Sequence, residues 1–267
     1  MLSNNFNFNF NSYLLIVISI LFIACSDAEK NEKEDILWYK QPAKNWNEAL
    51  PLGNGKLGVM VFGDTTKHHF QLNDDSMWPG DKDSWNEPEG NKEDIEAVRA
   101  LLFKGDNDKA DSLFVHKFSR KEVVRSHQTL GDLFINLDHK NITDYKRELN
   151  ISNATAKVSY KTDGNLITEN IFVSNPHKVI VIEITSEAKN GLNGKIKLNR
   201  PKDNGFATAT TFTSPENLLI MQGEVTQRGA KFNSEPSPIL NGVKFETRLE
   251  VKNNGGEIKI GTDYLEL

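Results

Sequence analysis

The chain has 267 residues, of which 37% are hydrophobic and 26% charged, and its formal net charge is −5. This length is enough for one large domain with a buried core. The single cysteine excludes an internal disulfide and a cysteine-pair zinc site. A mildly acidic chain does not attract a polyanion, so we expect no nucleic-acid partner.

Residues 1–24 are typical of a signal peptide. They contain no Asp, Glu, Lys or Arg, and Tyr13 to Ala24 form an apolar run that is too short to span a bilayer. Ala24 precedes Cys25, an arrangement that resembles a bacterial lipoprotein signal, although the n-region lacks the usual Lys or Arg. We therefore expect an exported lipoprotein of a bacterial cell envelope, held in the membrane by a lipid on Cys25. The alternative is a soluble secreted protein that is cleaved nearby.

A charged segment follows the signal. Residues 25–35 contain no large apolar side chain and cannot contribute to a core, so they are expected to form a tether. The folded domain is expected over 36–267. One interpretation is that the chain is cut just before the natural end of this domain.

From Ile36 onward the sequence predicts short strands separated by turn residues. The Asp163-Gly164 pair predicts a two-residue hairpin turn, because both residues accept positive φ angles. We therefore expect a mainly β fold, namely a large two-sheet antiparallel β-sandwich. The expected strands are 57–62, 68–72, 132–137, 156–162, 166–174, 179–186, 194–199, 207–212, 218–225, 243–252 and 257–260.

One segment predicts helices instead of strands. Apolar residues recur at helical spacing over 93–103, and Gly105 suits a C-terminal cap. Asp106 is expected to cap a second helix whose inward face carries Ala110, Leu113, Phe114 and Phe118. The sequence thus predicts a helical hairpin inserted in the sandwich, either a scaffold for another domain or a lid on the sandwich core.

The glycine-rich segment 53–63 is not expected to bind phosphate. A phosphate loop leads into a helix, whereas these glycines lead into a β run. They are expected to permit a tight turn and a close backbone approach before a buried strand.

The loop after residue 72 is the candidate substrate site. Asn73, Asp75 and Trp78 could bind a sugar, because an indole stacks on its apolar face while amide and carboxylate groups bond its hydroxyls. The alternative is that Asn and Asp form local turns and Trp78 packs in the core.

The remaining polar residues select no catalytic group. Acid and base in glycoside hydrolysis lie about 5 to 10 Å apart, and sequence spacing cannot choose one pair among 37 acidic residues. His68 and His69 are expected on opposite strand faces, and no histidine spacing indicates a metal site. No Gly-x-Ser-x-Gly elbow is present, so Ser hydrolysis has no support. We expect no metal and no cofactor.

Several segments share a family pattern in their order along the chain. They are Leu37-Trp38-Tyr39, Pro42-Ala43, Trp46, Glu48 to Gly55, Phe62-Gly63, Gln71 to Trp78, His127 to Leu133, Tyr145 to Ile151, Ala154 to Tyr160, Phe172 to Pro176 and Leu198 to Pro201. Together they resemble the N-terminal domain of glycoside hydrolase family 95, the α-L-fucosidase family. Asn199 departs from the usual serine, and Met77 and Pro79 vary the loop.

The resemblance implies a β super-sandwich that precedes an (α/α)6 barrel, and the family's inverting catalytic residues belong to that barrel. No catalytic residue is therefore expected in this chain, which alone should be inactive. The first hypothesis is the non-catalytic domain of an α-L-fucosidase acting on fucosylated glycans, truncated before its barrel. A second is a stand-alone surface lipoprotein that binds glycans through its tryptophans, Trp38, Trp46, Trp78 and Trp85. A third is a structural module that pairs with a separately encoded barrel.

Overall fold

The computed structural model describes residues 35–79, 89–119, 126–203, 205–225 and 243–267. By its internal contacts the chain divides into Met1–Asp35 and Ile36–Leu267, and only the second unit is treated below. The expected signal segment, Cys25 and nearly all of the tether lie outside the described residues, as does Trp85.

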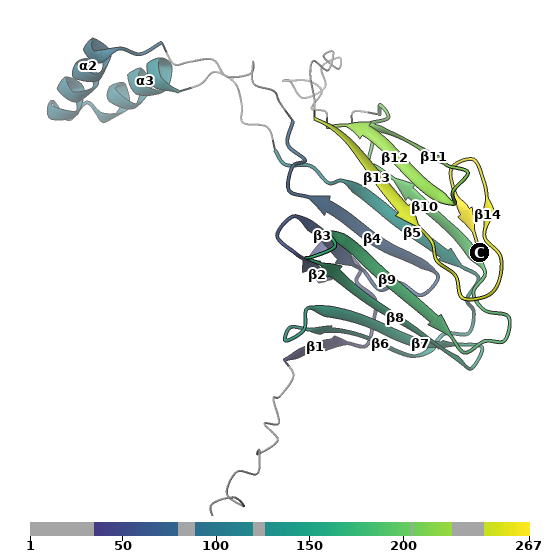
Figure 1. The fold of residues 1–267 in the computed structure, drawn as a ribbon. Helices are drawn as coiled ribbons and strands as arrows, with labels where there is room; N and C mark the ends of the chain where they lie inside the picture. The colour runs from purple at the N-terminus through teal and green to yellow at the C-terminus, as the bar shows by residue number, and fades with distance from the viewer. Residues whose placement is uncertain (1–34, 80–88, 120–125, 204, 226–242) are drawn as a thin grey trace, which may run out of the picture. The chain divides into compact units, whose positions relative to one another are not determined.

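Three antiparallel sheets make up the β structure (Figure 1). The first has five strands in the order β1-β6-β7-β8-β9. Its strands are β1 (Ile36–Tyr39), β6 (Thr143–Asn150), β7 (Thr155–Thr162), β8 (Asn165–Ser174) and β9 (Val179–Ser186). The predicted turn at Asp163-Gly164 joins β7 to β8 with φ angles of 47° and 81°, which confirms the hairpin.

The second sheet has seven strands in the order β14-β15-β10-β5-β4-β3-β2. Its strands are β2 (Leu50–Gly53), β3 (Leu57–Val61), β4 (Lys67–Asp74), β5 (Gly131–Leu137), β10 (Gly194–Asn199), β14 (Lys259–Ile260) and β15 (Leu265–Glu266). The glycine-rich segment forms the turn between β2 and β3, where Gly55 has a φ of +90°, and a strand follows it as expected.

A third sheet extends the predicted two-sheet sandwich. It has the order β11-β12-β13, with strands β11 (Ala209–Thr213), β12 (Leu218–Glu224) and β13 (Lys244–Glu250). These strands pair with one another, and β10 of the seven-stranded sheet packs against β11 and β12. At the other half of that sheet, β2 and β3 contact β7, β8 and β9. The mainly β, sandwich-like architecture is therefore confirmed, with a third sheet that the alternation pattern did not reveal.

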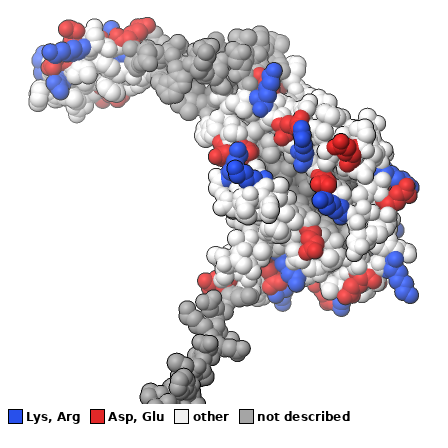
Figure 2. Space-filling model, viewed as in Figure 1, with Lys and Arg blue, Asp and Glu red and all other residues white. Residues whose placement is uncertain are grey.

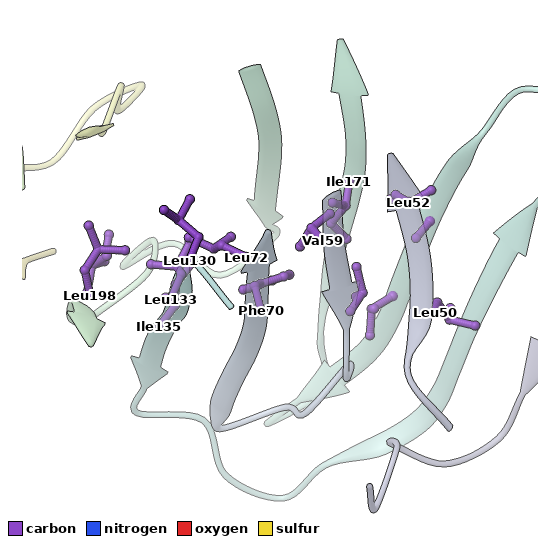
Figure 3. Close-up of a cluster of buried hydrophobic side chains, with 14 of the residues drawn as sticks. Leu50, Leu52, Val59, Phe70, Leu72, Leu130, Leu133, Ile135, Ile171 and Leu198 are labelled. Carbon is purple, nitrogen blue, oxygen red and sulfur yellow. The ribbon is translucent and has the colours of Figure 1, made fainter. Parts of the chain in front are cut away.

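One continuous core runs between the sheets. Alternation places every second residue inward, so Val59, Phe70, Leu133 and Ile171 are all buried. Figure 3 shows apolar side chains of successive strands following one another through this interior. On the outer surface, Figure 2 shows acidic and basic side chains interspersed over the face in view, without a large patch of one sign.

The helical hairpin is present. Helix α2 (Lys92–Phe103) begins with a capping box between Asn91 and Asp94, and helix α3 (Asn107–Phe118) follows. At the end of α2, Gly105 has a φ of +80° and its N–H donates to Leu102 O, while the Asp106 N–H donates to Leu101 O. These two bonds form a Schellman motif, as the glycine predicted.

Two details of the hairpin differ from expectation. Asp106 occupies the N-cap of α3, but its side chain makes no capping bond and pairs instead with Lys109, at 3.4 Å. The inward face is also narrower than predicted, since Ala110 is buried but Phe114 is 49% exposed. Phe103 is 92% exposed. Among the described residues, neither helix has the length and apolar character of a membrane span.

Candidate functional site

The loop after β4 is shaped by Asp74. Its carboxylate accepts bonds from the Ser76 N–H at 3.0 Å and the Ser76 hydroxyl at 2.6 Å, which form a local Asx turn. Burial alone would raise the pKa of Asp74, but these bonds and the charge of Lys56 hold it below the usual value. The predicted turn chemistry is therefore confirmed for this residue.

Trp78 lies on the surface beyond this turn. Its neighbour Met77 is 1% exposed and belongs to the core, whereas Trp78 is 49% exposed. The packed-core interpretation of Trp78 is therefore wrong, because it is Met77 that fills the interior. The indole meets the His127 ring edge-on, with centroids 5.2 Å apart, and His127 Nε2 lies 3.0 Å from Asp74 O. An exposed aromatic ring is thus supported from the side by a second ring that is itself anchored.

Arg200 holds the segment that carries His127. It is 7% exposed, its Nη2 donates to Gln128 Oε1 at 2.9 Å and its Nε donates to Thr129 O at 3.2 Å. Gln128 in turn donates its N–H to Met77 O, at 2.9 Å. Desolvation lowers the pKa of Arg200, and a guanidinium still keeps its charge at neutral pH. Residues 127–130 are therefore tied both to the end of β10 and to the loop of Trp78.

Two imidazole–carboxylate pairs flank strand β4. His68 Nδ1 lies 2.5 Å from Glu169 Oε1, and both side chains are at most 1% exposed. On the opposite face His69 Nε2 lies 2.6 Å from Asp132 Oδ1, with 26% and 14% of the side chains exposed. The inner pair is closed to any substrate because it lies in the core. The outer pair lies on the open face of a sheet.

An open hollow lies elsewhere, on the three-stranded sheet. It has a volume of about 430 Å3 and is wide open, with Glu224 as its acidic lining residue and Lys244 as its basic one. Paired carboxylates facing each other across a sugar are absent from this lining. Within the described part of the chain, no group of three or more His, Cys, Asp or Glu residues could hold a metal ion.

The residues that the sequence selected have different settings in the structure. Trp78 meets His127, while Asn73 lies in β4 opposite Gly58 and Asp75 is exposed in the turn. Sequence reasoning missed His127, Gln128 and Arg200 as parts of this site. These residues belong to two of the family motifs, at 127–133 and 198–201, and that membership could have pointed to them. The sequence did not indicate that the two motifs are in contact.

The comparisons with known proteins agree on a glycoside hydrolase domain. A family model described as "Glycosyl hydrolase family 65, N-terminal domain" matches residues 37–266. The chain is 27% identical to "Alpha-L-fucosidase 2" of Arabidopsis thaliana over 281 residues, 92% of this chain and 32% of that protein. It is 29% identical to "Probable alpha-fucosidase A" of Aspergillus oryzae over 57% of this chain and 22% of that protein.

A third relative, "Probable alpha-fucosidase A" of Aspergillus niger, is 27% identical over 57% of the chain and 20% of its own length. The chain thus spans about a third of the first relative and about a fifth of the other two. The expected glycoside hydrolase N-terminal domain is confirmed, whereas family 95 is not the family of the matching model. The match covers nearly all of the described residues, and the chain belongs to the family of glycosyl hydrolase family 65 N-terminal domains.

Proposed function

We propose that this chain is the non-catalytic N-terminal domain of a family 95-like α-L-fucosidase that acts on fucosylated glycans. The observation that carries the proposal is the match over 92% of this chain to a protein named as an α-L-fucosidase. The same match covers 32% of that relative, which leaves most of its length for a catalytic part. We place that part in a helical barrel, which corresponds to the portion of such an enzyme that the match does not cover.

The arrangement of acidic groups supports a non-catalytic role. Glycoside hydrolysis needs an acid and a base on opposite sides of one bond, about 5 to 10 Å apart. Glu169 is fully buried against His68, and Asp132 is bonded to His69 on a sheet face. Neither pair lines the open hollow on the three-stranded sheet.

The loop of Trp78 is the part of this domain that we propose contacts the glycan. An exposed indole, fixed by His127, stacks on the apolar face of a sugar, and the polar groups of Asn73 and Asp75 bond its hydroxyls. Because the ring is held before the ligand arrives, little entropy is lost when a sugar binds.

Two assays test the proposal. The purified chain should not hydrolyse an aryl α-L-fucoside, and robust turnover would contradict the placement of the catalytic groups. A chimera in which residues 36–267 replace the matching part of the Arabidopsis relative should hydrolyse the same substrate. In that chimera Trp78→Ala should raise KM more than it lowers kcat, while Trp38→Ala, on the five-stranded sheet, should change neither.

We further propose that the protein is exported and anchored to the bacterial cell envelope by a lipid on Cys25. The support is the apolar run that ends at Ala24 and the charged segment that follows Cys25. The unsubstituted chain should incorporate a radiolabelled fatty acid and partition into the detergent phase, whereas the Cys25→Ser variant should do neither. Labelling that persists in Cys25→Ser would contradict the anchor.

A further inference from the structure

The outer face of the seven-stranded sheet presents a second exposed indole, far along the chain from the loop of Trp78. Trp46 belongs to a short 3-10 helix, Trp46–Glu48, and is 54% exposed. Its Nε1 donates to Gln71 Oε1 at 2.7 Å, and Gln71 stands on β4. The hydrogen bond fixes the ring beside the sheet, while about half of its surface stays open to solvent.

A fixed carboxylate lies on the strand next to Gln71. Gln71 and Asp132 are directly opposite each other on β4 and β5, so their Cβ atoms are about 5 Å apart. Asp132 Oδ1 is held by His69 at 2.6 Å. The His69 ring is itself stacked between Phe62 and Phe134, with centroid distances of 4.1 and 4.7 Å. Two phenyl rings therefore fix the imidazole that fixes the carboxylate.

The bonds already made determine which atoms remain for a ligand. Since the Gln71 oxygen accepts from Trp46, its NH2 group is left to donate. Since Asp132 Oδ1 is engaged by His69, Oδ2 is left to accept. One donor and one acceptor, each fixed by a bond its residue already makes, thus lie on facing residues of neighbouring strands, and the donor belongs to the residue that holds the exposed indole.

We propose that Trp46, Gln71 and Asp132 form a binding site for one ring of a neutral glycan. The apolar face of the sugar stacks on Trp46, one hydroxyl of a vicinal pair accepts from Gln71 Nε2, and the adjacent hydroxyl donates to Asp132 Oδ2. The carboxylate disfavours sulfated or carboxylated sugars, because like charges repel. Asn73 of the Trp78 loop lies two residues beyond Gln71 on β4, but this site uses Trp46 as its aromatic ring and does not depend on the fucosidase proposal. A single ring bound on an open face should have a Kd of about 1 mM or weaker.

The test is a titration of the full chain, followed by the NMR signal of the Trp46 indole N–H. The probes are methyl α-L-fucopyranoside and methyl β-D-galactopyranoside, each of which has vicinal hydroxyls. Their fully O-methylated derivatives are the control ligands, because they keep the apolar face and lose the hydroxyl donors. At least one probe should shift the Trp46 signal to saturation, and the methylated derivatives should bind about tenfold more weakly.

The matched variants assign the site. Because the Trp46 variants lack the indole N–H, binding to all variants is followed by the line broadening of the probe's own NMR signals. Trp46→Ala and Gln71→Ala should each weaken binding about tenfold. Trp46→Phe should weaken it less, because the phenyl ring still stacks on the sugar. Trp38→Ala is the control, since Trp38 is also 54% exposed but lies on β1 of the other sheet. Trp78→Ala should likewise leave this binding unchanged.

Four results would overturn the site. They are the absence of binding by both probes, a saturated probe that leaves the Trp46 signal unmoved, equal losses in Trp46→Ala and Trp38→Ala, and binding that Trp78→Ala removes while Trp46 variants do not. Thermal unfolding of each variant verifies the fold, and if Trp46→Ala does not fold, Trp46→Phe and Gln71→Ala decide.

Discussion

His68 Nδ1 and Glu169 Oε1 lie 2.5 Å apart and join β4 of the seven-stranded sheet to β8 of the five-stranded sheet. Both side chains are at most 1% exposed. Despite the short contact, His68 Nδ1 and both carboxylate oxygens of Glu169 lack a hydrogen bond of ordinary geometry among the described residues. His68 Nε2 also faces the Tyr160 hydroxyl, at 3.3 Å. The pair is thus a polar contact across a mainly apolar interior.

Removal of one partner of this pair should destabilise the fold strongly. Glu169→Leu or His68→Leu each leaves a buried polar group without its partner, which costs about 3 to 5 kcal/mol. The double variant should lose less than the sum, because two apolar side chains need no partner. Urea unfolding of the unsubstituted chain, the two single variants and the double variant gives the coupling energy between His68 and Glu169.

The outer pair provides the control for that cycle. His69→Leu and Asp132→Leu remove the same types of group from partly exposed positions, and each should cost about 1 kcal/mol. Equal losses for the inner and outer pairs would show that burial does not set the cost.

Arg147 should hold the N-terminal segment of the domain in place. Its Nε donates to Gln41 O at 2.9 Å, its Nη1 donates to Glu48 O at 2.6 Å, and its guanidinium lies 4.5 Å from the centre of the Tyr39 ring. Arg147→Lys cannot form this fork, so residues 39–49 should exchange amide hydrogens faster. Hydrogen exchange measured by mass spectrometry tests this. Arg248→Lys, at an exposed position of β13, is the control and should leave the exchange in 39–49 unchanged.

Gly63 should tolerate no side chain. Its φ is +73°, and a Cβ would lie 2.7 Å from the Tyr145 hydroxyl and 3.2 Å from Arg147 Cδ. Gly63→Ala therefore combines backbone strain with a clash, and we expect a loss of about 2 to 4 kcal/mol. At Gly55 the φ is +90° and no atom lies within 4 Å, so Gly55→Ala should show the strain alone, about 1 kcal/mol. The difference between the two unfolding free energies measures the clash.

Acid should weaken the fold through His139. Burial lowers the pKa of His139 below 6.5, although a bond to Thr65 O opposes the shift. Between 6.5 and the lowered pKa the unfolded chain holds a proton that the folded chain lacks, so stability falls as the pH drops through this window. Asp64 contributes to the loss of stability in acid only at lower pH. Burial would raise its pKa, but bonds from the amides of Thr66 and Lys67 hold it below 3.8.

His139→Gln separates this contribution from others. The glutamine keeps a group that can bond Tyr160 and Thr65 but does not titrate, so the slope of stability between pH 6.5 and 5 should become smaller. An unchanged slope in urea unfolding would exclude His139 as its source.

The missed strands show where the sequence pattern stops being informative. Strand β6 carries charged residues at half of its positions, and its inward Arg147 breaks the apolar alternation. Strand β2 contains Pro51, which is tolerated because β2 is the edge of its sheet. Strand β1 is exposed along its whole length. Each of these strands is defined by its partner strand more than by its own residues.

The candidate site was predicted in part. The turn at Asp74 and the loop of Trp78 could be seen locally, because Asn, Asp and Ser bond their own backbone over a few residues. Nothing in the sequence placed His127 beside Trp78 or Arg200 beside Gln128, since those contacts depend on the neighbouring positions of β4, β5 and β10.

The sequence by itself determined the local structure of this protein. Alternating apolar residues specified most strands, Asp163-Gly164 specified a hairpin, and Gly105 specified the end of a helix, because these preferences act within a few residues. Only the tertiary structure decided which carboxylate meets which histidine, how the strands divide among three sheets and which indoles remain exposed. Those features join residues far apart in the chain, as His69 and Asp132 are by 63 positions, and they exist only after the sheets have packed.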